Sequence, residues 1–304
     1  MRSAADSWLI RAMPAVFIPV WSTGFIVARY GMPHAPPLTF LGWRYALSML
    51  CFLAWIAWSR PAWPRDRRQW FHLAVTGVLM HGGYLGGVWA AVKAGMGAGT
   101  IALLVGLQPV LTAVWLSRQS APPGSAHAVS RRQWAGLVLG FLGLLLVVWH
   151  KLGAGEITRF NLALALLALL SITVGTLYQK HHVLPCDVRT ANTVQLGAAL
   201  LVTLPFVPFE HEAVTLHPHF IGALAWSVVG LTVGGSSLLY MLIQRGAAAQ
   251  VTSLMYLVPP CTALLAWLLF DEPITLVMVA GMVLIALAVG LVVRAPAAPS
   301  RTAT

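Results

Sequence analysis

Long apolar runs separated by short polar gaps dominate the chain, and the runs recur about every 30 residues. An α-helix needs about 20 apolar residues to cross the hydrocarbon core of a bilayer, which is the length of most of these runs. Glycine- and proline-rich gaps, such as 31–37 and 121–125, end the runs. The pattern predicts an all-α integral membrane protein with ten transmembrane helices, over residues 12–31, 37–58, 70–92, 97–117, 132–150, 160–180, 189–209, 218–243, 247–270 and 274–293.

Composition agrees with a membrane protein. The 304 residues are 59% hydrophobic and 9% charged, with a mean hydropathy of +0.79, whereas soluble domains carry about 25% charged residues. The unbroken apolar runs also differ from the alternating pattern of an outer-membrane barrel. The three cysteines (Cys51, Cys186 and Cys261) lack CxxC spacing, so the sequence predicts neither a disulfide framework nor a zinc site.

The net charge of +11 is explained by its placement. Of the 19 lysines and arginines, 14 fall on the side that holds both termini and the even-numbered gaps, 4 fall on the other side, and Arg44 lies inside a predicted span. Positive residues accumulate on the cytoplasmic side of membrane proteins, so both termini are predicted to be cytoplasmic. The charge then requires no nucleic-acid partner, and the expected location is the cell inner membrane, with the lipid bilayer as partner.

The second half of the chain resembles the first at an offset of 151 residues. The matched positions include Gly24 with Gly175, Gly95 with Gly246, Ala98 with Ala249 and Pro109 with Pro260. We therefore predict two five-helix repeats, at 10–150 and 158–294, followed by a disordered cytoplasmic tail at 295–304. Because five is an odd number of crossings, the repeats are inverted, and inverted repeats in transporters place the substrate site near the midplane between them.

Several short motifs resemble those of a known family. They are Trp21-Ser22-Thr23-Gly24-Phe25, Phe40-x3-Arg44-x3-Ser48, Gly95-x2-Ala98 with Pro109, the later Gly136 and Gly143, and Glu272-Pro273. Together they resemble the EamA family of the drug/metabolite transporter superfamily. The resemblance implies ten helices in two inverted units and, often, export of amino acids, metabolites or drugs. The first half departs from it where Arg118-Gln119-Ser120 replaces the glutamate expected after the fourth span.

His81 is the main candidate for chemistry inside the membrane, because no Asp or Glu lies deep in a predicted span. It sits near the middle of 70–92, and histidine titrates near neutral pH. It is either a proton-coupling or substrate-contacting group, or a neutral imidazole hydrogen-bonded inside the bundle. Tyr84 adjoins a run of glycines that either packs helices closely or leaves space for a substrate.

The repeat extends this candidate site to the second half. The offset pairs His81 with Thr232, Leu85 with Ser236 and Trp89 with Tyr240. Each trio has i, i+4 spacing and so lies on one helical face, which predicts that 70–92 and 218–243 face one central cavity. Interior packing remains the alternative for Thr232 and Ser236, and an interfacial anchor the alternative for Tyr240.

Further candidates depend on single polar or aromatic residues. Arg44 either pairs with an anionic group on a substrate or, as the favoured reading, snorkels outward or bonds helix-end carbonyls. Asp271 and Glu272 are expected to favour the first turn of the last helix. The remaining candidate substrate contacts lie beside prolines that can kink their helices: Trp21, Ser22, Thr23, Gln108 and Tyr256.

The predicted function is a secondary transporter, an exporter by resemblance, of small metabolites such as amino acids or amphipathic compounds, with protons as a candidate coupling ion. No P-loop is present, and no cofactor is predicted. The acidic and histidine cluster at 210–219 fits no familiar ligand spacing, so no metal site is predicted. The alternative is an integral-membrane enzyme acting on a lipid-linked substrate, but the sequence contains none of the expected metal or acidic motifs.

Overall fold

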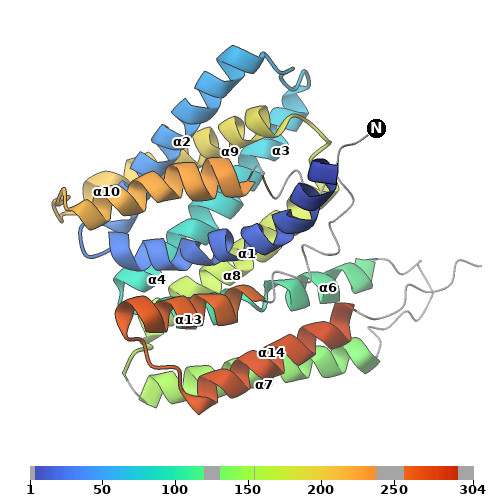
Figure 1. Cartoon of the computed structure of the whole chain (residues 1–304), viewed down its shortest axis with the longest axis vertical. Helices are drawn as coiled ribbons and strands as arrows, with labels where there is room; N and C mark the ends of the chain where they lie inside the picture. The colour runs from blue at the N-terminus through green and yellow to red at the C-terminus, as the bar shows by residue number, and fades with distance from the viewer. Residues whose placement is uncertain (1–3, 120–130, 154, 237, 239–256, 294–304) are drawn as a thin grey trace, which may run out of the picture.

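The computed structural model describes residues 4–119, 131–153, 155–236, 238 and 257–293, which form a bundle of helices (Figure 1). The first half contains α1 (Ala4–Gly31), α2 (Pro37–Ser59), α3 (Arg67–Gly77), the π-helix η1 (Val78–Leu85), α4 (Gly86–Lys93), α5 (Ala98–Val105), α6 (Gln108–Gln119) and α7 (Arg131–Gly153). The second half contains α8 (Arg159–His182), α9 (Val188–Thr203), the 3-10 helix η2 (Leu204–Phe209), α10 (Pro218–Ala225), the π-helix η3 (Trp226–Gly235), α13 (Val258–Phe270) and α14 (Leu276–Val293).

Six helices in the described part of the chain are long and apolar enough to cross a membrane: Pro37–Ser59, Arg67–Lys93, Trp134–Leu152, Arg159–His182, Val188–Phe209 and Pro218–Gly235. In the most apolar segments the side chains are not hidden inside the protein. The most apolar stretch of the Trp134–Leu152 helix has a mean hydropathy of 1.9, yet only 33% of its residues are buried inside the protein. An apolar surface of this kind is stable against lipid and unfavourable in water.

Polar side chains that cap the helices explain where several of them begin. Asp66 accepts a hydrogen bond from the Arg68 backbone N at 2.9 Å and starts α3, and the Nδ1 of His217 accepts one from the His219 N at 3.2 Å and starts α10. These two caps lie 151 residues apart, so they occupy the same place in the repeat. Capping side chains satisfy backbone N–H groups that have no partner inside the helix.

Equivalent helices of the two halves pack against one another. α2 contacts α9, and α7 contacts α14; Figure 1 shows the α2–α9 pair at the top and the α7–α14 pair at the bottom. α7 and α14 approach closely at two facing glycines, since a Cβ on Gly143 would lie 3.0 Å from the carbonyl oxygen of Gly281. Small residues at such contacts let membrane helices pack backbone to backbone.

The connections gather at two ends of the bundle. We call the end formed by 32–36, 94–97, 155–158, 210–217 and 271–275 the carboxylate end, because it holds five of the eight acidic residues. There the Thr215 N donates to the His34 carbonyl oxygen at 2.8 Å, which joins the start of α2 to the connection after η2.

At the opposite end, which we call the arginine end, the Nε2 of Gln69 on α3 donates to the Leu184 carbonyl oxygen at 2.8 Å, and Arg189 Nη1 on α9 donates to Ser59 Oγ at 2.6 Å. α2 therefore runs from the carboxylate end to the arginine end, and α9 runs in the opposite direction.

In each half, one π-helical segment interrupts the third membrane helix. Moving η1 (78–85) along the chain by 151 residues gives 229–236, which overlaps η3 (226–235). The sequence predicts uninterrupted α-helices over 70–92 and 218–243. The structure corrects this prediction, because a π segment lies within each span. A π segment widens the turn and exposes carbonyl groups, and such segments are frequent at functional sites. In η1, the His81 carbonyl oxygen accepts a hydrogen bond from Tyr45 OH at 2.7 Å. In η3, the Ser227 carbonyl oxygen accepts one from Thr232 Oγ1 at 2.8 Å.

Candidate functional site

A buried arginine lies where α2 crosses η3. Arg44 is 6% exposed, and its Nε and Nη2 donate to Thr232 Oγ1 at 3.3 and 3.2 Å. Its guanidinium carbon lies 5.2 Å from the ring centre of Trp89, in cation–π contact. Among the ion pairs found in the described residues, none involves Arg44. Because a buried charge is costly without an opposite charge, this guanidinium is suited to receive one from a ligand.

Unpartnered polar atoms surround the same arginine. Within the described part of the chain, four buried side-chain atoms have no hydrogen-bond partner: Arg44 Nη1, Ser48 Oγ, Trp89 Nε1 and Ser227 Oγ. Ser48 follows Arg44 by one turn on α2, and the Ser227 carbonyl is already bonded to Thr232. Buried polar groups are normally paired, so four exceptions in one region call for an explanation. Two of these atoms are obligate donors, and they suit a ligand that carries acceptor oxygens, such as a carboxylate.

A second pair of residues repeats this arrangement in the other direction. The side chain of Gln195 on α9 is in polar contact with that of His81 on η1. Gln195 is the repeat counterpart of Arg44, and Thr232 is the counterpart of His81. In each case a residue from the second helix of one half contacts the π segment of the other half. The two halves are thus joined at their centre by two crossed polar contacts, which we call the crossed pairs.

The position of Arg44 corrects a sequence-based expectation. The residue does not snorkel to the surface, because Trp89 and Thr232 enclose its guanidinium group. His81 lies on η1 and Thr232 lies on η3, the segments that the 151-residue offset relates. The sequence-based prediction overlooks Tyr45, whose ring centre lies 6.0 Å from that of His81, and it assigns no role to Gln195. The repeat offset was the available signal for Gln195, since it maps Arg44 onto that position.

Other candidate residues are engaged in helix packing. Ser22 Oγ donates to the Ile18 carbonyl oxygen at 2.8 Å, and Thr23 Oγ1 accepts from Trp226 Nε1 at 2.8 Å. Trp21 packs against Phe17, with ring centres 5.2 Å apart. The first and the last of these contacts lie within α1, whereas the Thr23–Trp226 hydrogen bond connects α1 to the start of η3.

The last five candidates are spread over the chain. Gln108 Nε2 donates to Thr112 Oγ1 at 3.2 Å and to Thr176 Oγ1 at 3.4 Å, away from the crossed pairs. Ser236 is half-buried directly after η3. Tyr84 is half-buried on η1. Tyr240 and Tyr256 lie outside the described residues.

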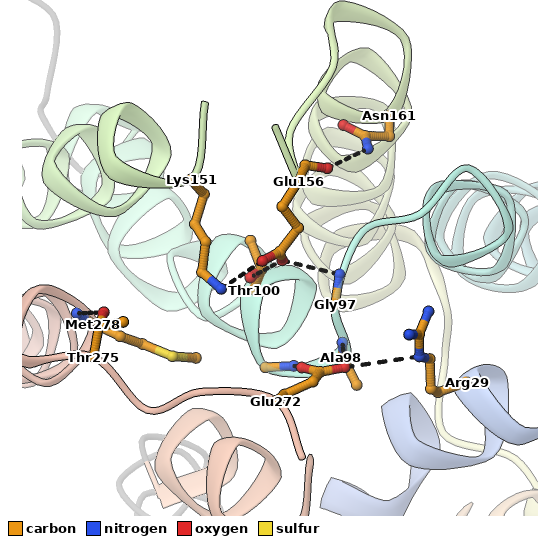
Figure 2. A network of polar contacts seen from close by, with 11 residues as sticks. Arg29, Gly97, Ala98, Thr100, Lys151, Glu156, Asn161, Glu272, Thr275 and Met278 are labelled. Atoms are coloured by element: carbon orange, nitrogen blue, oxygen red, sulfur yellow. Dashed lines mark hydrogen bonds and ion pairs between the residues drawn. The ribbon is translucent and has the colours of Figure 1, made fainter. Parts of the chain in front are cut away.

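Two carboxylates bind the start of α5 at the carboxylate end (Figure 2). Glu272 accepts from the backbone N of Ala98 at 3.0 Å and of Gly99 at 3.3 Å. Glu156 accepts from the Gly97 N at 3.1 Å and from Thr100 Oγ1 at 2.6 Å. We call this arrangement the α5 clasp. Negative charge is favourable at a helix N-terminus, where backbone N–H groups lack partners.

The α5 clasp revises the role expected for Glu272. Its carboxylate bonds α5 of the first half, whereas the sequence suggested the first turn of the last helix. Gly97 makes room for both acids, since a Cβ there would lie 2.8 Å from an oxygen of each. Burial alone would raise the pKa of Glu156, but hydrogen bonds from Lys151, Thr100 and Gly97 outweigh it and hold the pKa below its usual value.

Comparison with known proteins decides the family. The model of the EamA-like transporter family matches the chain twice, over residues 7–149 and 159–294. The chain belongs to the EamA-like transporter family. The predicted resemblance is therefore confirmed. A crystal structure of a protein with 15% sequence identity has the same fold, with a TM-score of 0.64 over 93% of this chain and 96% of that one.

Relatives of this EamA-like chain are transporters by name. A probable amino-acid metabolite efflux pump of Salmonella typhimurium is 25% identical over 276 residues, which cover 88% of each chain. The inner membrane transporter YedA of Escherichia coli is 24% identical, over 84% of this chain and 81% of its own length. A transporter of Archaeoglobus fulgidus is 24% identical, over 83% of this chain and 86% of its own length. Together with the six membrane-length helices, the family confirms a multi-pass protein of the inner membrane.

Proposed function

We propose that this EamA-like protein is a secondary transporter that exports small carboxylate-bearing metabolites, amino acids foremost, by alternating access. The observation that carries the proposal is the buried Arg44, which forms no ion pair with the described residues and has unpartnered donors and hydroxyls around it. Export of amino-acid metabolites is also the activity in the printed name of the Salmonella relative.

The proposed topology has ten helices in two inverted five-helix units, residues 10–150 and 158–294, with both termini cytoplasmic. The opposite directions of α2 and α9 and the excess of basic residues at the arginine end support it. The carboxylate end then faces the outside. The proposed disordered tail, 295–304, lies outside the described residues.

In this mechanism the substrate carboxylate accepts hydrogen bonds from Arg44 Nη1 and Trp89 Nε1. The Nε and Nη2 of Arg44 stay on Thr232, which fixes the plane of the guanidinium fork. The aromatic and hydroxyl side chains predicted from the sequence, including Trp21, Tyr84 and Ser236, line the path of the rest of the molecule. His81 is the proposed acceptor of a coupling proton, because it is the imidazole within the π segment η1 and histidine titrates near neutral pH.

Alternating access follows from how the contacts are distributed. The crossed pairs join the halves at the centre, whereas the α5 clasp joins them at the carboxylate end through Glu272 of the second half and α5 of the first. Opening outward requires Glu272 to release α5, while the crossed pairs act as the pivot. The described conformation is thus the outward-closed state of the proposed cycle.

The test is transport of an amino acid and of its uncharged carboxamide in vesicles that contain the purified protein. We expect the wild type to move the acid and to leave the carboxamide, and Arg44→Gln to lose at least tenfold in transport of the acid. The control is Arg68→Gln, which replaces an exposed arginine at the arginine end. This variant should transport the acid at the wild-type rate. Thermal unfolding of each variant separates loss of function from loss of fold. Equal transport of acid and carboxamide would refute the assignment of Arg44.

A further inference from the structure

Three histidines from both halves of the chain meet at the carboxylate end. His34 lies between α1 and α2, His217 caps α10, and His219 lies in the first turn of α10. One ring nitrogen of each lies within 4.8 Å of the other two. The ring centres are 4.4 Å apart for His34 and His217, and 4.7 Å apart for His217 and His219. The sequence showed only the second-half members of this group, and their spacing alone suggested no metal.

We propose that these three histidines form a binding site for a divalent transition metal, with Zn²⁺ as the representative ion. Imidazole nitrogens favour zinc, copper and nickel, whereas magnesium and calcium prefer oxygen ligands. The nearby acids are already occupied: Glu210 accepts from the backbone N of Leu38 and Thr39, both at 2.8 Å, and Glu212 pairs with Lys93. Three nitrogens with a water molecule as fourth ligand complete a tetrahedral zinc site.

Small side-chain rotations are enough to form this site. Zinc–nitrogen bonds of about 2.0–2.1 Å place tetrahedral ligands about 3.4 Å apart, so the nitrogens must close in from within 4.8 Å. His217 gives up the 3.2 Å hydrogen bond that its Nδ1 accepts from the His219 N, since a neutral ring that binds metal has no other free lone pair. The backbone on both sides is already fixed by the Thr215–His34 hydrogen bond, and His219 is exposed, so the metal can enter from solvent.

The site bridges the two repeats. His34 belongs to the stretch 7–149 that matches the family model, and His217 and His219 belong to the stretch 159–294. A bound metal therefore ties the first half to the second beside the α5 clasp. On the proposed function, zinc added at the outer side then holds the transporter in its outward-closed state and slows transport.

Binding is tested with the purified full-length protein and zinc chloride alone, by calorimetric titration and by thermal unfolding. We expect each chain to bind one zinc ion tightly. Binding should raise the unfolding temperature, and a chelator should reverse this rise. His34→Ala and His219→Gln should each weaken zinc binding at least tenfold. His150→Ala removes an exposed histidine outside the cluster and should leave it unchanged. His217 is left intact in this test because it caps α10. Unchanged zinc affinity in the first two variants, or no binding at micromolar zinc, would overturn the site.

The bridging role has a separate readout. Zinc on the outer face should slow amino-acid export by the wild type at least fivefold, and His34→Ala should relieve this inhibition without changing export in zinc-free buffer. Tight binding without inhibition would overturn the bridging role alone. If no amino acid is exported in zinc-free buffer, the proposed function fails, while the zinc titration still decides the metal site.

Discussion

Replacing Glu272 by glutamine should loosen the start of α5 and leave the rest of the fold intact. The carboxylate is 18% exposed and accepts from two backbone N–H groups, at 3.0 and 3.3 Å. Glutamine keeps one acceptor oxygen, so the variant loses one of two charge-assisted hydrogen bonds, each contributing about 1.5–3 kcal/mol. It also loses the favourable charge at the helix N-terminus, worth about 0.3–1 kcal/mol. We therefore expect opening of the first turn of α5 to become easier by about 2–4 kcal/mol, which is about 30-fold or more.

Amide hydrogen exchange over residues 96–105 measures this opening directly. The matched control is Glu212→Gln at the same end of the bundle. Glu212 pairs with Lys93, but its side chain is 61% exposed, and exposed ion pairs contribute at most about 1 kcal/mol. The control should therefore change exchange in α5 very little. If Glu272→Gln and Glu212→Gln have equal effects on α5, or if neither changes it, the α5 clasp does not hold this helix.

Three further predictions concern the centre, the clasp and the helix packing. Arg44→Lys should insert and fold but transport the amino acid at least tenfold more slowly, as measured in vesicles. The planar guanidinium group can hydrogen-bond Thr232 and a substrate carboxylate at once, whereas an ammonium group lacks this forked geometry. The pKa of Glu156 is lowered in the folded state, so the carboxylate stabilises the fold fully above pH 4.5, and this stabilisation is lost as the pH falls through the folded pKa. Thermal unfolding measured between pH 7 and pH 3 should show this loss of stability. In Glu156→Gln the unfolding temperature should depend less on pH over the same range. Gly143→Ala should lower stability by about 1–3 kcal/mol, because its Cβ would lie 3.0 Å from the Gly281 carbonyl oxygen. Gly290→Ala, whose Cβ would meet no neighbouring side chain or helix within 4 Å, should be at least as stable as the wild type.

Helix positions followed closely from the sequence because membrane length and turn residues are local signals. The predicted span 37–58 became α2 (Pro37–Ser59), and the span 160–180 became α8 (Arg159–His182). The repeat offset carried information beyond single helices, since it related His81 to Thr232 across 151 residues. The predicted span 97–117 contains a break that the apolar pattern concealed, because α5 ends at Val105 and α6 begins at Gln108.

The remaining features depend on contacts between distant segments. Periodicity cannot distinguish a π-helix from an α-helix, so η1 and η3 went unpredicted. Arg44 looked like a surface residue from its place near a helix end, and only its contact with Thr232, 188 residues away, places it inside. The histidine cluster likewise required His34, which precedes His217 and His219 by more than half the chain.

The contact between Arg44 and Thr232 also has a consequence for biogenesis. A ribosome adds about 5–20 residues per second, so the 188 residues that separate the two partners take about 10 to 40 s to synthesise. During that interval the newly inserted α2 carries a cationic side chain without the Thr232 hydroxyl that accepts its hydrogen bonds in the folded protein. Isolated arginine in a membrane helix is energetically unfavourable, so the nascent first half depends on the insertion machinery or on trapped water until the second half arrives. Prematurely terminated chains should therefore be recognised as incomplete by quality-control proteases.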